Sequence, residues 1–240
     1  MLFVSTAAQA DDYWSGVYVG VGAGFSDLQE RLDVLGTSVT PSTGITFNGG
    51  TDAPFATVMG GYRNAFGRVV FGAEFSYTSM RAEFTGQQCT NTVIFPCAST
   101  GVEGELWDMW RGRLSVGTTV DDKTLVSVNG GVSAATVAFT GLSAVALAAG
   151  GGAGGSGAGG GADGETSVGF NIGGSVERKL TERVSLRFEG IFDRVYGNDV
   201  NAGARANGFS GGSTASASAE QDGRFPIDVF SFQGAVLFTF

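Results

Sequence analysis

The chain is 240 residues long and contains 41 glycines and 19 phenylalanines, which favours strands and turns over long helices. Lysine and arginine total 14 against 23 acidic residues, for a formal net charge of -9, so nucleic acid is not an expected partner. The sequence has no histidine, which excludes Ser/His/Asp triads, HExxH zinc sites and histidine-ligated haem. We therefore expect an all-β, non-enzymatic protein without a cofactor or a metal site.

Residues 1–10, MLFVSTAAQA, contain a short apolar patch and end in the A-x-A pattern of a signal-peptide cleavage site. We interpret them as the tail of a partial signal peptide, and residues 11–240 as the mature domain. An ordinary N-terminus is the alternative. In an exported protein, Cys89 and Cys97 favour a loop disulfide over two free thiols.

A period of two, in which large apolar residues alternate with small or polar ones, recurs along the chain and predicts strands. Between 68 and 78, for example, Val69, Phe71 and Phe75 share one face while Gly72 and Glu74 share the other. Eight such stretches are predicted, at 14–26, 55–63, 68–78, 105–117, 124–138, 166–178, 183–193 and 229–240.

The predicted connections alternate between short and long. Short ones lie at 64–67, 118–123 and 179–182, and long ones at 27–54, 79–104, 139–165 and 194–228. An even number of strands with this asymmetry is typical of an eight-stranded antiparallel up-and-down transmembrane β-barrel, with short periplasmic turns and long extracellular loops. A Gly/Ala-rich tract near 140–165 predicts one flexible loop. The GVGAG run at 20–24 lies inside a strand, so we expect its glycines to ease strand curvature or to make room in a narrow barrel.

Several local motifs carry a family resemblance. They include WSGVYVGVGAG at 14–24, GGYRNAFGRVVFGAEFSY at 60–77, WRGRLSVG at 110–117 and SLRFEG at 185–190. In their order and spacing they resemble the small porin-like, opacity-type outer-membrane β-barrels of alphaproteobacteria, which are related to the OmpA transmembrane domain. Ser115 and Gly190 depart from the family pattern. The resemblance implies export through the periplasm to the outer membrane of a Gram-negative bacterium.

The face opposite the large apolar residues would point into the barrel and carries charges of both signs. An unpaired charge there would cost several kcal/mol, so we expect an interlocked ion network. A structural plug is favoured over a gate or narrow polar path, because eight strands leave an interior that side chains fill. If interior carboxylates carried out acid/base chemistry, Glu177 and Glu189 would be the first candidates. Nearby arginines lower the pKa of a carboxyl group, which favours a structural role for both residues. The predicted network comprises Glu74, Arg111, Arg113, Glu177, Arg187, Glu189 and Asp193.

The last eleven residues, FSFQGAVLFTF, continue the alternation to Phe240. We expect this strand to pair with the first one, which would close the barrel and leave no free edge. Gln233, Phe238 and Phe240 also resemble the C-terminal signal that the barrel assembly machinery reads. Aromatic residues near strand ends are expected to form interfacial girdles: Trp14, Tyr62, Trp110, Phe139, Phe192 and Phe230.

The sequence thus predicts an integral outer-membrane barrel with a structural and surface-exposed role in the cell envelope. We expect a monomer whose partners are outer-membrane lipid, lipopolysaccharide and, during biogenesis, the assembly machinery. A narrow passive channel for ions or small solutes is the first alternative. The second is a soluble lipocalin-like carrier, which would have an apolar interior and a charged exterior.

Overall fold

In the computed structural model, the described residues are 14–30, 50–90, 97–147, 155–159, 162–196, 203–210, 213–220 and 226–240. They contain no helix that is long and apolar enough to cross a lipid bilayer. The secondary structure there is strand: β1 (Gly16–Glu30), β2 (Gly50–Phe66), β3 (Val69–Met80), β4 (Ala82–Thr90), β5 (Cys97–Asp121), β6 (Thr124–Leu147), β7 (Gly155–Gly159), β8 (Ala162–Lys179), β9 (Val184–Tyr196), β10 (Gly203–Ser210), β11 (Ser213–Glu220) and β12 (Pro226–Thr239).

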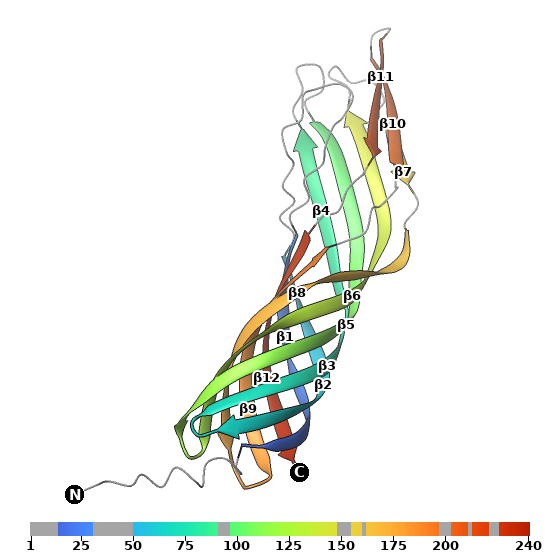
Figure 1. The fold of residues 1–240 in the computed structure, drawn as a ribbon. Coiled ribbons are helices and arrows are strands. Elements are labelled where there is room, and N and C mark those ends of the chain that lie inside the picture. Colours follow the sequence, from blue (N-terminus) through green and yellow to red (C-terminus); the bar gives the residue numbers. More distant parts are fainter. Residues whose placement is uncertain are drawn as a thin grey trace, which may run out of the picture.

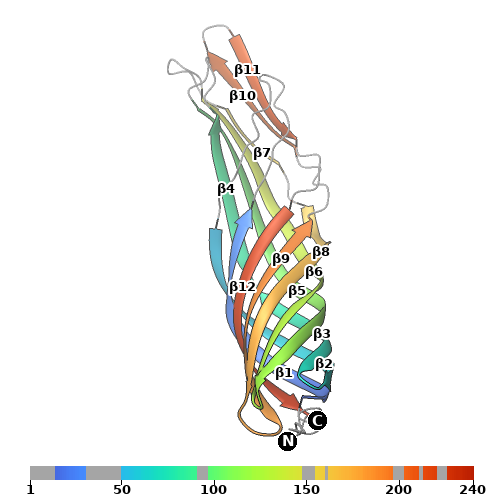
Figure 2. The ribbon, with the colours of Figure 1, turned by 60° about the vertical axis from the view of Figure 1, so that its left-hand side comes forward.

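Eight of these strands close into an antiparallel barrel in the order β1, β2, β3, β5, β6, β8, β9, β12 (Figures 1 and 2). Closure is made by β12, which pairs with β1 from Tyr18↔Thr239 to Glu30↔Ile227. The predicted fold class and the pairing of the last strand with the first are both confirmed. Because every barrel strand has a neighbour on both sides, the barrel has no open edge.

Short hairpin turns join the strands at one end of the barrel. Gly67 and Arg68 connect β2 to β3, and Gly67 has a φ of 64°. Glycine adopts this left-handed conformation without the steric cost that a side chain brings, and such turns match the twist of the flanking strands. β1 begins and β12 ends at the same end of the barrel as these turns (Figure 1), since Gly16 pairs with Arg63 and the Phe240 NH donates to the Val17 carbonyl.

The other end of the barrel differs from the prediction, because strands occupy much of the expected loops. β6 continues to Leu147, β7 pairs with it, and β8 begins at Ala162, so the loop expected at 139–165 is partly strand. Residues 148–154 and 160–161 lie outside the described residues. The hydrogen bonds between paired strands are made by backbone groups. A segment of Gly, Ala and Ser can therefore pair although its composition does not predict a strand.

Two β-bulges lie where β5 and β6 leave the barrel. The register shifts between Leu106 and Met109, and shifts again between Glu103 and Gly104. A bulge inserts one extra residue and moves the following side chains to the other face. As a result Leu106 and Met109 are both buried although they stand three residues apart.

The glycines of the GVGAG run lie where the interior is most crowded. A Cβ on Gly24 would lie 2.0 Å from the backbone oxygen of Phe232 and 2.7 Å from the ring of Phe55. A Cβ on Gly20 would lie 2.2 Å from the side chain of Leu237. No side chain fits at these distances, so the glycines allow close approach inside the barrel, as the sequence predicted.

Candidate functional site

The outer surface of the barrel is an uncharged apolar band. Every barrel strand contributes large apolar side chains that are exposed, including Leu114 of β5 and Phe232 of β12, each 71% exposed. On β3 the outward residues from Val69 to Ser79 include no charged residue, and the same holds on β12 from Phe230 to Phe240. A continuous belt of this kind is much larger than the apolar patches of soluble monomers.

Charged side chains border the band at both ends. At the short-turn end they include Arg68, Asp121 and Arg178, which are exposed. At the other end Arg81 lies 3.4 Å from Glu105, and Arg194 lies 2.6 Å from Asp228. The band therefore has two limits along the barrel, with water-compatible residues beyond each of them.

Aromatic rings gather toward the end with long connections. Trp110 stacks against Tyr77 at 4.4 Å and Phe75 at 5.5 Å between ring centroids, and Phe192 and Phe230 are 4.8 Å apart. Tyr and Trp are typical of membrane–water interfaces. The side chain of Phe139, also expected in a girdle, lies outside the described ones.

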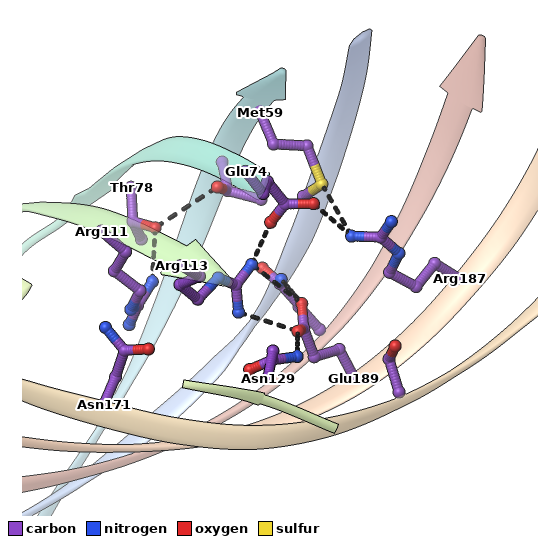
Figure 3. Close-up of polar contacts among 12 residues, drawn as sticks. Met59, Glu74, Thr78, Arg111, Arg113, Asn129, Asn171, Arg187 and Glu189 are labelled. Carbon is purple, nitrogen blue, oxygen red and sulfur yellow. Dashed lines mark hydrogen bonds and ion pairs between the residues drawn. The ribbon is translucent and has the colours of Figure 1, made fainter. Parts of the chain in front are cut away.

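The barrel interior holds a chain of alternating charges (Figure 3). Arg113 donates hydrogen bonds to Glu189, at 2.7 Å, and to Glu74. Arg187 donates to the other oxygen of Glu74 and, at 3.1 Å, to Glu177. Each carboxylate in this chain is held by at least one guanidinium, which offsets the cost of its burial.

The chain of charges extends beyond the predicted residues to Arg63 of β2. Its guanidinium donates two hydrogen bonds to Glu177, at 2.8 and 3.0 Å. Sequence analysis missed Arg63 because Phe55 and Met59 share its inward face, so the face did not look polar. The exposed neighbours Val58 and Tyr62 were the available signal, since alternation from them places residue 63 inside.

A second ion pair lies nearer the end with long connections. Arg111 contacts Asp193 through Nε at 2.9 Å and through Nη2 at 2.8 Å. Ser133 also donates to Asp193, at 2.6 Å, and Asn171 donates to Ser133. The structure thus places all seven predicted residues inside the barrel and joins five of them in one chain, with Arg111 and Asp193 as a separate pair.

Neutral polar groups complete the interior. Tyr18 donates a 2.6 Å hydrogen bond to Glu74, and Asn129 and Gln233 each donate one of 2.6 Å to Glu189. With Arg63 included, the described interior side chains contain four arginines and four carboxylates, and Lys179 is a fifth buried cation. The dense bonding fits a structural plug, because arginine, amide or hydroxyl donors hold both Glu177 and Glu189.

Trp14 is a correction to the predicted aromatic girdle. It is 1% exposed and packs inside the barrel mouth with Ala65, Val70 and Leu125. The Arg63 Cζ lies 5.0 Å from the centroid of its ring, and the Lys179 Nζ lies 5.2 Å from it. A ring between two cations gains cation–π attraction that lipid could not supply, which explains why Trp14 points inward.

Beyond the apolar band, the polarity of the barrel wall reverses. On β1 the exposed Phe25 and buried Ser26 are followed by outward Asp27 and buried Leu28. On β9 the buried Asp193 is followed by outward Arg194 and buried Val195. We call the part with polar exterior and apolar interior the outer section, and the part with apolar exterior and polar interior the membrane-level section.

The remaining sequence predictions fall largely outside what the structure describes. Residues 1–10 are not among the described residues, and the side chains of Cys89 and Cys97 are not described, so the signal peptide and the disulfide stay predictions. Of the proposed C-terminal signal, Gln233 points inward, whereas Phe238 and Phe240 are exposed on the outer surface. Among the described side chains, no group of three or more acidic or cysteine residues could hold a metal ion.

No protein-family model matches the chain, and no curated protein matches it in sequence. Among solved structures it is similar to Neisserial surface protein A, with a TM-score of 0.48 and 11% identity over 94% of this chain and 98% of that one. It is also similar to OprG from Pseudomonas aeruginosa, with a TM-score of 0.49 and 10% identity over 94% and 96% of the two chains. For Ail of Yersinia pestis the TM-score is 0.42, with 8% identity over 94% and 99%.

Proposed function

We propose that this chain is a non-enzymatic integral β-barrel protein of a Gram-negative outer membrane. The observation that carries the proposal is the uncharged apolar band, which runs around a closed barrel and ends in charged residues on both sides. Lipid is the solvent in which such a surface is stable, and a closed barrel is the β-structure whose backbone groups are all paired within it. An exposed belt of this size would aggregate in water.

The soluble lipocalin-like alternative requires an apolar interior and a charged exterior throughout the barrel. The membrane-level section has the opposite arrangement, with Arg113 and Glu189 inside and Leu114 and Phe188 outside. A water-facing exterior of this kind would lack a hydrophobic driving force for folding, so the arrangement argues against a soluble carrier.

We propose further that the short turns face the periplasm and that the long connections face the cell exterior, as in other outer-membrane barrels. Support for a surface role comes from β5 and β6, which stay paired from Met109↔Ala135 at the edge of the band to Cys97↔Leu147 (Figure 2). At roughly 3.3 Å per residue this paired segment is about 40 Å long. It would carry part of the chain well past the lipid headgroups.

A narrow passive channel is the second candidate, and the observation that favours it is the polar interior. A channel would give discrete conductance in planar bilayers, and replacing Arg113 or Glu74 would change it. The burial of these side chains argues for the structural role, because ions need a hydrated path.

The proposed partners are outer-membrane lipid, lipopolysaccharide and the assembly machinery, with Gln233, Phe238 and Phe240 as the recognised residues and the monomer as the working form. Deleting Phe240 should then reduce the amount of inserted protein in cells more than it impairs folding in detergent. Equal outer-membrane levels with and without Phe240 would contradict this role. The opacity-type resemblance of the motifs is consistent with these partners.

The experiment that tests the function is fractionation of expressing cells, followed by gel electrophoresis of boiled and unboiled samples. We expect the protein in the outer-membrane fraction, with different migration before and after boiling because the closed barrel resists detergent. Recovery as a soluble periplasmic protein that migrates identically in both samples would overturn the proposal.

A further inference from the structure

The outer section contains a ring of buried apolar side chains that the predicted ion network did not include. Register pairs Leu28 with Val229 and Val195 with Ile227, and alternation turns Met80 and Leu106 toward the same interior. All are buried, and all except Met80 are fully so. We call this ring the apolar collar: Leu28, Met80, Leu106, Val195, Ile227 and Val229.

The collar and the ion network lie in series along the interior. The outermost polar pair of the membrane-level section, Arg111 and Asp193, is followed on β9 by Val195. Anything that crosses the barrel would have to pass both layers. The two layers, however, resist water and ions for different reasons.

The ion network consists of groups that water can solvate. Arginine and glutamate side chains carry several rotatable bonds, so they can exchange their mutual hydrogen bonds for bonds to water without moving the backbone. A network of this kind leaves no hydrated path while its side chains stay paired, but its groups can bind water and ions when they rearrange. The six collar side chains, by contrast, are aliphatic or thioether groups that offer an ion or a water molecule no strong hydrogen-bond partner, and narrow apolar constrictions expel water from pores.

The collar side chains, Met80 apart, also have fewer rotatable bonds than the arginines and glutamates of the network. Like the network, the collar lies on strands that have neighbours on both sides, as Leu28 has in Thr51 and Val229. A short aliphatic side chain cannot swing out of the lumen through such a wall. Opening the collar would therefore require neighbouring barrel strands to break their backbone hydrogen bonds.

We propose that the apolar collar, and not the ion network, makes this barrel impermeable to water and ions. The proposal rests on the proposed function, because it assumes a barrel that spans a membrane. It assigns the two layers different tasks: the network stabilises the membrane-level section, and the collar seals it.

The test is conductance of the full chain in planar bilayers, for the unaltered protein and three variants. The first variant combines Leu28→Ser, Leu106→Ser and Ile227→Ser. The second replaces the same three residues with alanine, which removes similar volume and adds no polar group. The third combines Glu74→Gln and Arg113→Gln, which removes one charge of each sign from the network.

We expect no conductance from the unaltered protein, the alanine variant or the glutamine variant, and discrete conductance from the serine variant. An apolar cavity of this size stays dry, whereas hydroxyl groups give water partners. A conducting unaltered protein or glutamine variant would overturn the proposal, and so would a silent serine variant that migrates as a folded barrel. If the serine triple does not fold, the single variant Leu106→Ser replaces it, with an increase in conductance over Leu106→Ala as the expected result and equal conductance as the contrary one.

These outcomes differ from a failure of the proposed function. If the chain is not a membrane protein, it will not insert, and unboiled and boiled samples will migrate alike. If it inserts and conducts without alteration, the membrane assignment stands and the assignment of the seal fails.

Discussion

The membrane-level section and the outer section are built from the same strands but have opposite polarity. On β5, Arg111 is buried and Trp110 exposed, whereas a few residues away Leu106 is buried and Glu105 lies on the outside. Hydrogen bonding along the ladder is continuous through both sections apart from the bulges. The comparison shows that strand pairing alone does not determine whether the barrel interior is polar or apolar, and the proposed change from lipid to water outside the wall accounts for the difference.

The two sections also depend on different forces. In the proposed membrane setting, transfer of the exterior of the membrane-level section from water to lipid would supply the hydrophobic stabilisation, and charge-assisted hydrogen bonds hold the interior. In the outer section the interior is apolar, as in a water-soluble protein. Substitutions of matched type in the two sections should therefore give different losses of stability.

The largest effect is expected from Glu189→Ala. Glu189 accepts hydrogen bonds from Arg113, Asn129 and Gln233, and removing it leaves buried donors without their acceptor. Breaking a buried ion pair costs about 3–5 kcal/mol. The free energy of unfolding in urea, measured in lipid vesicles, should fall by that amount.

Arg111→Ala, which leaves Asp193 buried without its guanidinium, should likewise lower thermal stability. The matched control is Glu83→Ala. Its carboxylate lies 4.0 Å from Arg81 and both side chains are exposed, so a change of less than about 0.5 kcal/mol is expected. Equal losses for Glu189→Ala and Glu83→Ala would show that the interior pairs contribute little.

A second comparison uses two leucines of β5. Leu106 is 0% exposed in the outer section, and Leu114 is 71% exposed in the membrane-level section. Leu106→Ala should cost about 2–5 kcal/mol, because it leaves a cavity among fixed neighbours. Leu114→Ala loses only the transfer of its side chain to lipid, since lipid chains close the gap. If urea unfolding shows the two losses to be equal, the outer section has no packed core of its own.

An arginine placed on the exterior of each section provides another comparison of their stabilities. Leu114→Arg puts a cation into the apolar band and should cost about 2–4 kcal/mol if the position lies near the middle of the bilayer. Glu83→Arg places the same side chain on the exterior of the outer section, where water solvates it, and little change is expected. The measurement is again urea unfolding in vesicles. Similar costs at both positions would contradict the assignment of the band to lipid.

The smallest effect concerns Asp121 in the turn between β5 and β6. The pKa of its carboxyl is held below the usual value, because it accepts hydrogen bonds from the Lys123 backbone NH at 2.8 Å and the Thr124 hydroxyl at 3.1 Å. A lowered pKa in the folded state means stability that is present above about pH 4, the usual pKa of aspartate, and is lost as pH falls through the folded value.

Asp121→Ala should therefore be slightly less stable than the unaltered protein at pH 7, and the two should converge in strong acid. Asp122→Ala is the control, because it removes a charge from the same turn. A difference that stays constant from pH 7 to pH 2 would exclude the proposed linkage.

The alternation of residues predicted the barrel well, because lipid on one side and polar groups on the other impose a period of two on every strand. It placed Phe230 and Phe232 outside and Ser231 and Gln233 inside, as the structure does. Alternation shows that the two faces of a strand differ in polarity, but it does not show which face points into the barrel. For this reason the reversal at Asp27 and Leu28 could not be read from the sequence.

Members of the interior ion network could be predicted from the sequence only where charged residues alternate with large apolar ones. Arg187 and Glu189 alternate with Leu186 and Phe188, so the sequence predicts that both charged side chains point into the barrel. Arg63 shared its face with apolar residues and was missed. Partners were not predictable at all, since the pairing of Arg63 with Glu177 joins β2 to β8 across the lumen.

The two bulges of β5 and β6 have a consequence for how the chain can change in length. One adds a residue to β5 between Leu106 and Met109, and the other adds a residue to β6 just beyond Phe139. The second restores the pairing offset that the first had altered, so the pairs from Glu103↔Gly141 to Cys97↔Leu147 keep the same offset as Met109↔Ala135. A one-residue deletion in either strand would shift the pairing of that segment, whereas deletions of Asp108 and Thr140 together would preserve it. Natural insertions and deletions at this rim should therefore occur in pairs.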